Sequence, residues 1–267
     1  MKVVTNAAQL PDSARPRAVV MTMGALHEGH ASLLDIARAH GASVIATIFV
    51  NPTQFGPGED FERYPRTLEA DLELCAAHEV DVVYTPSVAD VYPNGPAATV
   101  HVGELGATLE GAARPGHFDG MATVVMRLLD LTDADVAVFG EKDAQQLAIV
   151  RQIAAKQGRS VKIVAAPTVR EPDGLAMSSR NRYLDTAERA AAAAIPAALN
   201  AAAGETSAES MINAARAVLE RQPLVRVEYL EIADEAFRPI TRGEGRLLIA
   251  ARVGQTRLID NIKVELG

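Results

Sequence analysis

The chain has 267 residues, a length that suggests one large or two modest domains. Its hydrophobic content of 48% is enough for a buried core, and an aromatic content of only 4% indicates that aliphatic side chains fill it. A formal net charge of −8 disfavours a nucleic-acid-binding surface, which is usually basic, but leaves room for a local basic pocket that binds an anion. The single cysteine excludes an internal disulfide, and neither a signal peptide nor an apolar span of about 20 residues is evident, so we expect a cytoplasmic protein.

Short apolar, β-rich runs alternate with helical patterns over the first 168 residues. The expected strands are 18–21, 43–49, 81–85, 135–139 and 161–165, and the expected helices lie near 30–36, 66–78, 119–131 and 142–157. Nearly all-apolar strands that alternate with helices are typical of a doubly wound, Rossmann-like parallel sheet covered on both faces. Ligands bind such sheets at the carboxyl ends of the strands, so the polar loops after three of these strands predict one site.

The composition changes after the turn Pro172-Asp173-Gly174. Alanine-rich helices are expected near 185–203 and 207–221, and Pro196 should kink or split the first of them. Three β-like runs follow at 225–232, 246–252 and 257–264, joined by residues 243–245 and 254–255. The pattern predicts a smaller α+β domain with an antiparallel meander, which gives domains of 1–168 and 169–267.

A glycine-rich turn at residues 23–30 links the first predicted strand to a helix and carries two histidines, His27 and His30. Backbone N–H groups and the helix dipole at such a turn favour a phosphate. The turn is not a P-loop, because His30 and Ala31 replace the required Lys and Ser/Thr, and it has no dinucleotide fingerprint. A zinc site would lack a third ligand nearby. An ordinary glycine turn with two solvated histidines stays open.

Two further segments suit an anionic ligand. Lys142, at the start of a predicted helix, is electrostatically unfavourable there unless an anion neutralises it, although a solvated helix start is the alternative. The loop at 176–181 contains Ser178, Ser179 and Arg180, which could wrap phosphate oxygens. Alternatively, its serines cap the following helix.

Other polar residues allow both a functional and a structural interpretation. The amides of Gln54 and Gln146 suit a small polyhydroxy acid, but surface glutamines are common. Asp71 could help to hold Mg²⁺ through water or could be a solvated helix acid. Residues 114–120 form either a mobile cover or a plain connection, and Cys75 fits a small core residue better than a nucleophile.

Together, these segments resemble the pantothenate synthetase (pantoate–β-alanine ligase) family. The similarity extends along nearly the whole chain and is carried by blocks in the family's order: 23–30, 49–55, 64–67, 116–120, 139–143 and 177–181. The first and last blocks are also similar to those of a wider HxGH nucleotidyltransferase-like superfamily that includes class I aminoacyl-tRNA synthetases.

The resemblance implies ATP-dependent condensation of pantoate with β-alanine to pantothenate, a coenzyme A precursor, through a pantoyl adenylate, with release of AMP and pyrophosphate. It implies His30 as the proton donor, with donors from His27, Lys142 and Arg180 stabilising the growing charge. Gln54 and Gln146 would hold pantoate, and Gln54 would also lie near β-alanine. The implied ATP-binding residues are Met23, Gly24, Ala25, Leu26, His27, Glu28, Gly29, His30, Gly140, Glu141, Lys142, Asp143, Val169, Met177, Ser178, Ser179 and Arg180.

The resemblance also implies the partners of the chain. Mg²⁺ would shield the β,γ-phosphates of ATP, the C-terminal domain would close over the ATP site, and the protein would be a homodimer. Two other classes stay open, a nucleotidyltransferase that stops after transferring AMP and a non-catalytic nucleotide-binding module. The acidic balance disfavours a tRNA-charging role.

Overall fold

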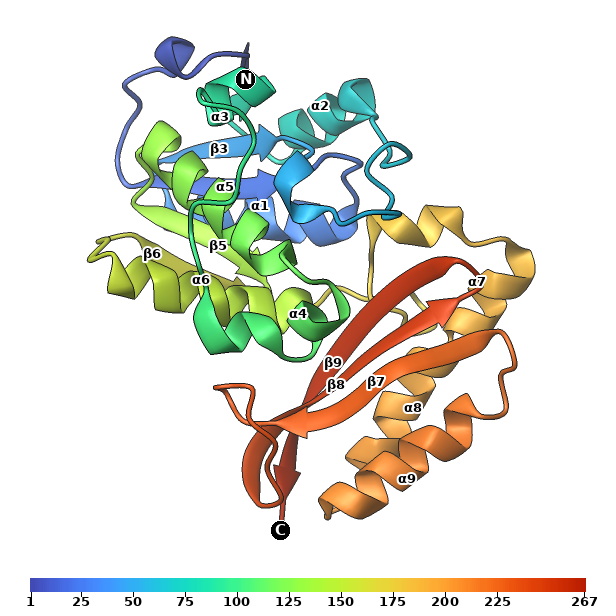
Figure 1. Ribbon diagram of the computed structural model, residues 1–267. Coiled ribbons are helices and arrows are strands. Elements are labelled where there is room, and N and C mark those ends of the chain that lie inside the picture. The colour runs from blue at the N-terminus through green and yellow to red at the C-terminus, as the bar shows by residue number, and fades with distance from the viewer. The chain divides into compact units, whose positions relative to one another are not determined.

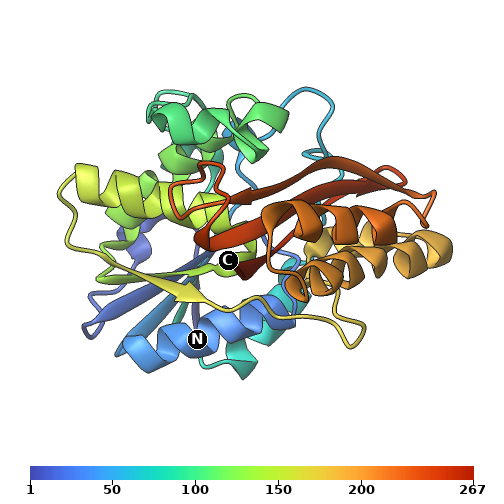
Figure 2. The same cartoon turned by 90° about the horizontal axis from the view of Figure 1, so that it is seen from below.

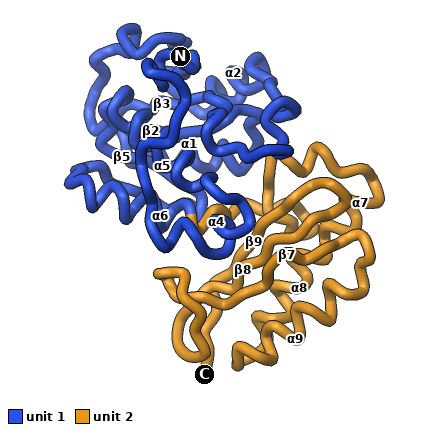
Figure 3. Tube along the Cα trace, in the orientation of Figure 1, with its two compact units in different colours: residues 1–141, 146–167 blue, residues 142–145, 168–267 orange.

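The computed structural model describes all 267 residues, which fall into two compact units. Unit 1 consists of Met1–Glu141 and Gln146–Pro167, and unit 2 consists of Lys142–Gln145 and Thr168–Gly267 (Figure 3). The short Lys142–Gln145 segment therefore belongs to unit 2 although it is flanked in sequence by unit 1. No helix combines the length and apolar character that crossing a membrane requires.

Unit 1 is built on a six-stranded, fully parallel sheet with the order β1-β4-β3-β2-β5-β6. Its strands are β1 (Lys2–Val4), β2 (Arg17–Thr22), β3 (Ser43–Ile48), β4 (Val82–Tyr84), β5 (Val136–Gly140) and β6 (Lys162–Ala166). The predicted Rossmann-like parallel sheet is thereby confirmed. The edge strand β1 was missed, because three residues are too few to show a periodic pattern.

Helices cover both faces of this sheet (Figures 1 and 2). The α-helices are α1 (Glu28–His40), α2 (Leu68–Ala77), α3 (Val88–Val91), α4 (Glu110–Ala113), α5 (His117–Thr132) and α6 (Ala144–Lys156). The 3-10 helices in this part of the chain are η1 (Ala7–Gln9), η2 (Pro52–Gln54), η3 (Gly103–Ala107) and η4 (Glu141–Asp143). Side chains of α5 and α6 pack on one face of the sheet, and those of α1 and α2 pack on the other.

The alternation of side chains along each strand explains the nearly all-apolar runs in the sequence. Val19 of β2 belongs to the core under α5 and α6, whereas its neighbour Val20 belongs to the core under α1 and α2. Ile45 and Ala46 of β3 divide in the same way. Successive strand residues point to opposite faces, so a sheet covered on both sides requires apolar residues at every position.

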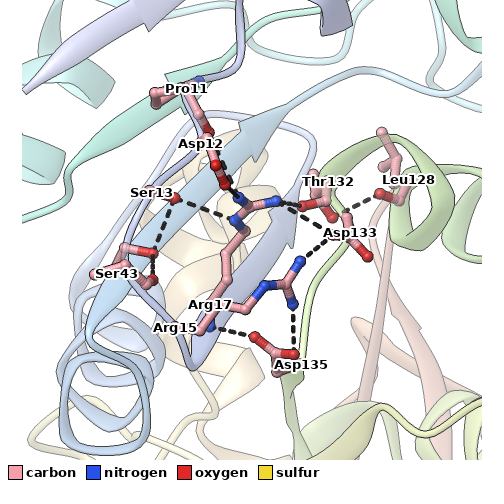
Figure 4. A network of polar contacts seen from close by, with 11 residues as sticks. Pro11, Asp12, Ser13, Arg15, Arg17, Ser43, Leu128, Thr132, Asp133 and Asp135 are labelled. Carbon is pink, nitrogen blue, oxygen red and sulfur yellow. Dashed lines mark hydrogen bonds and ion pairs between the residues drawn. The ribbon is translucent and has the colours of Figure 1, made fainter.

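The amino end of β2 is tied to the end of α5 by a polar network (Figure 4). Arg17 is only 7% exposed, and it donates to the Thr132 carbonyl at 2.8 Å and to Ser13 Oγ at 3.1 Å. Asp135 accepts from the backbone N–H of Arg17 at 2.7 Å and from Arg15 at 2.6 Å, contacts that hold its pKa below the usual range. In a parallel sheet this end lies opposite the carboxyl ends that bind ligands, so the network serves the fold.

Unit 2 combines a three-stranded antiparallel meander with helices on one of its faces. The meander has the order β7-β8-β9, and its strands are β7 (Val225–Ala233), β8 (Gly243–Val253) and β9 (Thr256–Leu266). The helices of this unit are η5 (Ser179–Tyr183), α7 (Thr186–Ala192), α8 (Ala194–Ala203) and α9 (Ala208–Leu219). Alanine side chains of α7 to α9 pack with the inward-facing aliphatic residues of the sheet.

Two boundaries in unit 2 refine the predictions from sequence. The expected split of the first helix occurs at Ala193, and Pro196 lies in the first turn of α8, where its missing N–H needs no helical partner. The expectation that residues 243–245 form a connection is wrong. They belong to β8, because Gly243 and Gly245 pair with Leu266 and Val264 of β9.

Candidate functional site

Three strands that precede predicted site residues are neighbours in unit 1. β2 lies between β3 and β5 in the sheet, and all three run in the same direction. The histidine turn follows β2, Gln54 lies in the segment after β3, and Gly140 ends β5. The expectation that these polar segments share the carboxyl edge of the sheet is therefore confirmed for unit 1.

The two histidines form a capping box at the start of α1. His27 is the N-cap, and its Nδ1 accepts from the backbone N–H of Gly29 at 3.1 Å. His30 Nδ1 accepts from the backbone N–H of His27 at 3.3 Å, and the two ring centres are 4.2 Å apart. Because each Nδ1 acts as an acceptor, the hydrogen of each neutral ring must be on Nε2. The turn thereby fixes two imidazoles as Nε2–H donors.

The backbone N–H groups of this turn are used inside the protein. Gly24 donates to Thr22 Oγ1 at 3.1 Å, and Ala25 and Leu26 donate to the Asp71 carboxylate at 3.0 and 2.8 Å. The backbone N–H of His30 donates to the His27 carbonyl at 2.7 Å. The expectation that backbone N–H groups of this turn would bind a phosphate is therefore wrong for these groups, because side chains and a carbonyl of the protein already accept from them. The turn offers a ligand the donors of its side chains instead.

Asp71 takes a place that the sequence did not predict. Its side chain is buried, with 2% exposure, and it also accepts from Thr67 Oγ1 at 3.0 Å. The interpretation as a solvated helix acid is wrong. Both carboxylate oxygens already accept hydrogen bonds, which favours holding the turn over holding Mg²⁺. Gly24 has a φ of +84°, and a Cβ there would lie 3.0 Å from Asp71 Oδ2, so the close approach requires glycine.

The side chain of Gln54 is oriented by a buried amide. Asn51 is 1% exposed, and its Nδ2 donates to Gln54 Oε1 at 2.9 Å. Asn51 is held in turn by the Tyr92 hydroxyl, which donates to its Oδ1 at 2.6 Å. With Oε1 engaged, the Nε2 group of Gln54 is directed as a donor, and it lies 3.3 Å from Met23 Sδ. Gln146 is half-buried in the first turns of α6.

In unit 2, the predicted ATP-binding residues before η5 are adjacent. The backbone N–H of Met177 donates to the Val169 carbonyl at 3.0 Å, next to the β-bridge between Arg170 and Ala176. Ser178 caps η5 by accepting from the backbone N–H of Arg180 at 3.3 Å. The capping interpretation of this serine is confirmed. The cap fixes the start of η5, whose first two residues are Ser179 and Arg180.

Lys142 is anchored by a residue that the sequence did not reveal. The Nδ2 of Asn261, on β9, donates to the Lys142 carbonyl at 2.9 Å, and Asn261 is 4% exposed. Arg246 of β8 donates to Asn261 Oδ1. η5 also packs against β9, so one strand supports both the lysine and the serine–arginine segment. A separation of 119 residues between Asn261 and Lys142 leaves no local signal in the sequence.

The predicted site residues thus form two groups. Unit 1 carries those at 23–30, Gln54, Asp71, Gly140, Glu141 and Gln146, and unit 2 carries Lys142, Asp143, Val169 and those at 177–180.

Cys75 is fully buried in unit 1. Its burial, and to a smaller extent the negative charge of nearby Asp71, raises the pKa of its thiol to about 11. Its prediction as a core residue is confirmed.

Comparison with known proteins gives one consistent result. The family model described as pantoate-beta-alanine ligase matches residues 2–263. A pantothenate synthetase from Acidothermus cellulolyticus is 56% identical over 258 residues, which cover 92% of this chain and 85% of the relative. One from Nocardia farcinica is 54% identical over 256 residues, covering 95% and 80% respectively.

Solved structures agree with these relatives. The pantothenate synthetase from Thermus thermophilus has a TM-score of 0.93 and 43% identity, covering 98% of this chain and 99% of its own. The pantoate-beta-alanine ligase from Francisella tularensis, complexed with beta-gamma ATP and β-alanine, has a TM-score of 0.84 and 34% identity, covering 98% and 97%. On the fold, the ordered blocks and these matches, the chain belongs to the pantoate–β-alanine ligase family.

Proposed function

We propose that this chain forms pantothenate from pantoate and β-alanine, uses ATP to activate pantoate as an adenylate, and releases AMP and pyrophosphate. Family membership over residues 2–263 supports a ligase that joins these two substrates. The observation that carries the adenylate step is the histidine turn at the carboxyl edge of the sheet, where two imidazoles are fixed as Nε2–H donors.

The chemistry has two steps. An oxygen of the pantoate carboxylate attacks the α-phosphorus of ATP, and pyrophosphate leaves. The amine of β-alanine then attacks the activated carbonyl carbon, loses a proton and displaces AMP to form the amide. Neither step needs a covalent enzyme intermediate, so catalysis depends on positioning and on stabilising charge on the phosphoryl oxygens.

The residues divide these tasks. The Nε2–H groups of His27 and His30 would donate hydrogen bonds to phosphoryl oxygens, with that of His30 directed at the oxygen of the departing pyrophosphate. Lys142 and Arg180 would balance the negative charge that grows as pyrophosphate departs. The oriented Nε2 of Gln54 suits an oxygen of pantoate, and Gln146 would provide a second amide. The other predicted ATP-binding residues of both units keep that assignment in this proposal.

Magnesium enters this proposal as part of the ATP substrate. No group of three or more His, Cys, Asp or Glu side chains is arranged to hold a metal ion, and both oxygens of Asp71 bind the histidine turn. The bound cation would shield the β- and γ-phosphates of ATP.

The reaction class can be tested by product formation. The protein is incubated with Mg·ATP and pantoate, with and without β-alanine, and free AMP is measured over many turnovers. We expect AMP to accumulate only with the amine present. A nucleotidyltransferase that stops after AMP transfer would show no dependence on β-alanine, and a binding module would show ATP binding by calorimetry without any product.

His30→Ala tests the adenylate step. We expect pyrophosphate release in a single turnover to slow by ~10²–10³, comparable to the loss of one oxyanion-hole donor. His40→Ala is the matched control, because it removes an exposed imidazole at the opposite end of α1. An unchanged adenylation rate in His30→Ala would remove this histidine from the mechanism.

A further inference from the structure

One cluster of charged side chains joins three segments of unit 1 that surround Gln54. Arg114, between α4 and α5, makes a two-pronged ion pair with Glu59, with its Nε and Nη2 donating to the two carboxylate oxygens at 2.7 Å each. The arginine side chain is 12% exposed and the glutamate 24%. Partial burial of both ends and paired hydrogen bonds distinguish this pair from ordinary surface ion pairs, which contribute little.

The same guanidinium fixes a histidine in one tautomer. His117 Nδ1 lies 2.8 Å from the Gln54 carbonyl oxygen, which can only accept, so Nδ1 carries the hydrogen. The lone pair of His117 Nε2 then accepts from Arg114 Nη1 at 3.0 Å. Burial, reinforced by the arginine charge, lowers the pKa of His117 to about 4, which keeps this ring neutral near pH 7.

These contacts converge on the backbone of Gln54. Its carbonyl oxygen accepts from His117 Nδ1 and also from Arg114 Nη2 at 3.4 Å. The other end of the residue is held by Asn51, which binds the side-chain oxygen. A glutamine fixed at both its main chain and its amide presents its remaining donor, Nε2, in one direction.

Glu59 belongs to a segment that packs on itself. Phe55, directly after Gln54, makes edge-on ring contacts with Phe61 and Tyr64, at centroid distances of 5.4 and 6.0 Å. Arg66 lies over the Phe61 ring. The ion pair of Glu59 therefore ties this aromatic segment, and with it the chain on the carboxyl side of Gln54, to the start of α5.

We propose that Arg114, Glu59 and His117 form a latch that positions Gln54 to bind the hydroxy acid substrate. The three residues of the latch are positioning residues, because they act on the substrate through Gln54. The proposal rests on the proposed function, in that Gln54 must contact pantoate. The latch gives a reason why the segment that contains Glu59 should affect the affinity for pantoate and not the affinity for ATP.

Steady-state kinetics of Glu59 variants test the latch. We expect Glu59→Ala to raise the KM for pantoate about tenfold, the equivalent of about 1.4 kcal/mol, while the KM for ATP stays within about twofold. Glu59→Gln keeps one acceptor for the guanidinium and should recover part of the loss. Asp130→Ala, which breaks the ion pair with Arg159, is the matched control and should change neither constant.

A merely structural role would give a different result. If Glu59→Ala only lowered the amount of folded enzyme, kcat would fall and both KM values would stay unchanged, which would overturn the proposal. A parallel rise of both KM values would also overturn it. The proposed function is tested separately, by β-alanine-dependent AMP release in the wild-type protein. If the wild type shows this release and Glu59→Ala has an unchanged KM for pantoate, only the latch is rejected.

A second measurement follows the latch without activity. Arg63 and Arg66 are exposed trypsin sites in the segment that contains Glu59. We expect cleavage after Arg63 to be at least about fivefold faster in Glu59→Ala than in the wild type or in Asp130→Ala, because local opening exposes the backbone to protease. Equal cleavage rates in all three proteins would show that the ion pair does not hold the segment, and would overturn the proposal.

Discussion

His27 and His30 owe their ring orientation to the helix that they cap. Each Nδ1 accepts a backbone N–H, so the local demand of the α1 terminus determines which nitrogen carries the hydrogen. Serine or aspartate would cap the helix equally well. Only histidine has a second ring nitrogen that can still donate a hydrogen bond while the first nitrogen accepts from the helix. One pair of residues therefore begins a helix and supplies two oriented donors.

Asp71→Asn tests what holds this turn. The amide would place an NH₂ group where an oxygen now accepts from Ala25 or Leu26, leaving a buried donor unsatisfied. We expect a loss of about 1–3 kcal/mol in the free energy of unfolding, together with slower adenylation, because the turn also carries the histidines.

Glu69→Gln is the control for Asp71→Asn. It removes an equal charge from the first turn of α2, but its side chain is exposed. Its effect on unfolding by denaturant should stay within about 0.5 kcal/mol. If Asp71→Asn were as mild, the carboxylate would not be the element that holds the turn.

Single residues were predicted from the sequence only where the signal was local. Ser178 stands two positions from the N–H that it caps, and its capping role was among the interpretations of the sequence. The capping box of His27 and His30 is equally local but was not predicted, because histidine is not among the preferred capping residues. The Ala25 and Leu26 N–H groups that Asp71 accepts from lie 46 and 45 residues away, and Asn261 lies 119 residues from Lys142. Such contacts depend on the packing of the finished fold, which residue spacing does not encode.

At the level of elements, α5 packs closely against η2, the short helix that ends at Gln54. Gly120 of α5 faces the backbone of η2, and its carbonyl accepts from Asn51 Nδ2 at 3.3 Å. A Cβ at Gly120 would lie 2.0 Å from the Thr53 carbonyl oxygen and 2.9 Å from the Gln54 nitrogen. Both neighbours are backbone atoms, so no side-chain rotation could relieve the overlap.

Gly120→Ala is therefore expected to push η2 away from α5. We expect a destabilisation of about 1–3 kcal/mol by thermal or denaturant unfolding, with a raised KM for pantoate. Gly204→Ala is the control, because its added Cβ would meet an ordinary contact of 3.6 Å at a negative φ. Equal stability of the two variants would mean that α5 and η2 can separate without cost.

The elements of the parallel sheet were predicted well because the physical constraint on them is strong. Burial on both faces makes β2, β3 and β5 apolar at nearly every position, and such runs stand out in the sequence. The start of β8 was missed because glycines were interpreted as a connection. Its pairing with the far end of β9, the next strand of the hairpin, decides that those residues are extended.

For the molecule as a whole, His117 predicts how stability depends on pH. The folded-state pKa of His117 is about 4, below its ordinary value of 6.5. Between these values the unfolded state binds more protons at this position, so stability is lost as the pH falls from about 6.5 to about 4. Arg114 opposes protonation of the ring, whereas Glu59 and Glu110 favour it.

Comparison with His117→Gln isolates this contribution. Chemical denaturation at several pH values between 4 and 7 should give a flatter profile for the variant, because glutamine does not titrate. Carboxylates that do not interact with His117 contribute equally to both proteins over this range, so the difference between the two profiles reports the histidine together with its coupling to Glu59 and Glu110. Parallel profiles would mean that His117 titrates alike in the folded and unfolded chain.

The assignment of Lys142–Gln145 to unit 2 has a consequence for dividing the gene. The polypeptide passes from one unit to the other three times, at 141/142, at 145/146 and at 167/168. A fragment that starts at Thr168 would lack the lysine, and the amide of Asn261 would lose the carbonyl to which it donates. Two halves expressed separately would have to reassemble before Asn261 could again hold the backbone of Lys142.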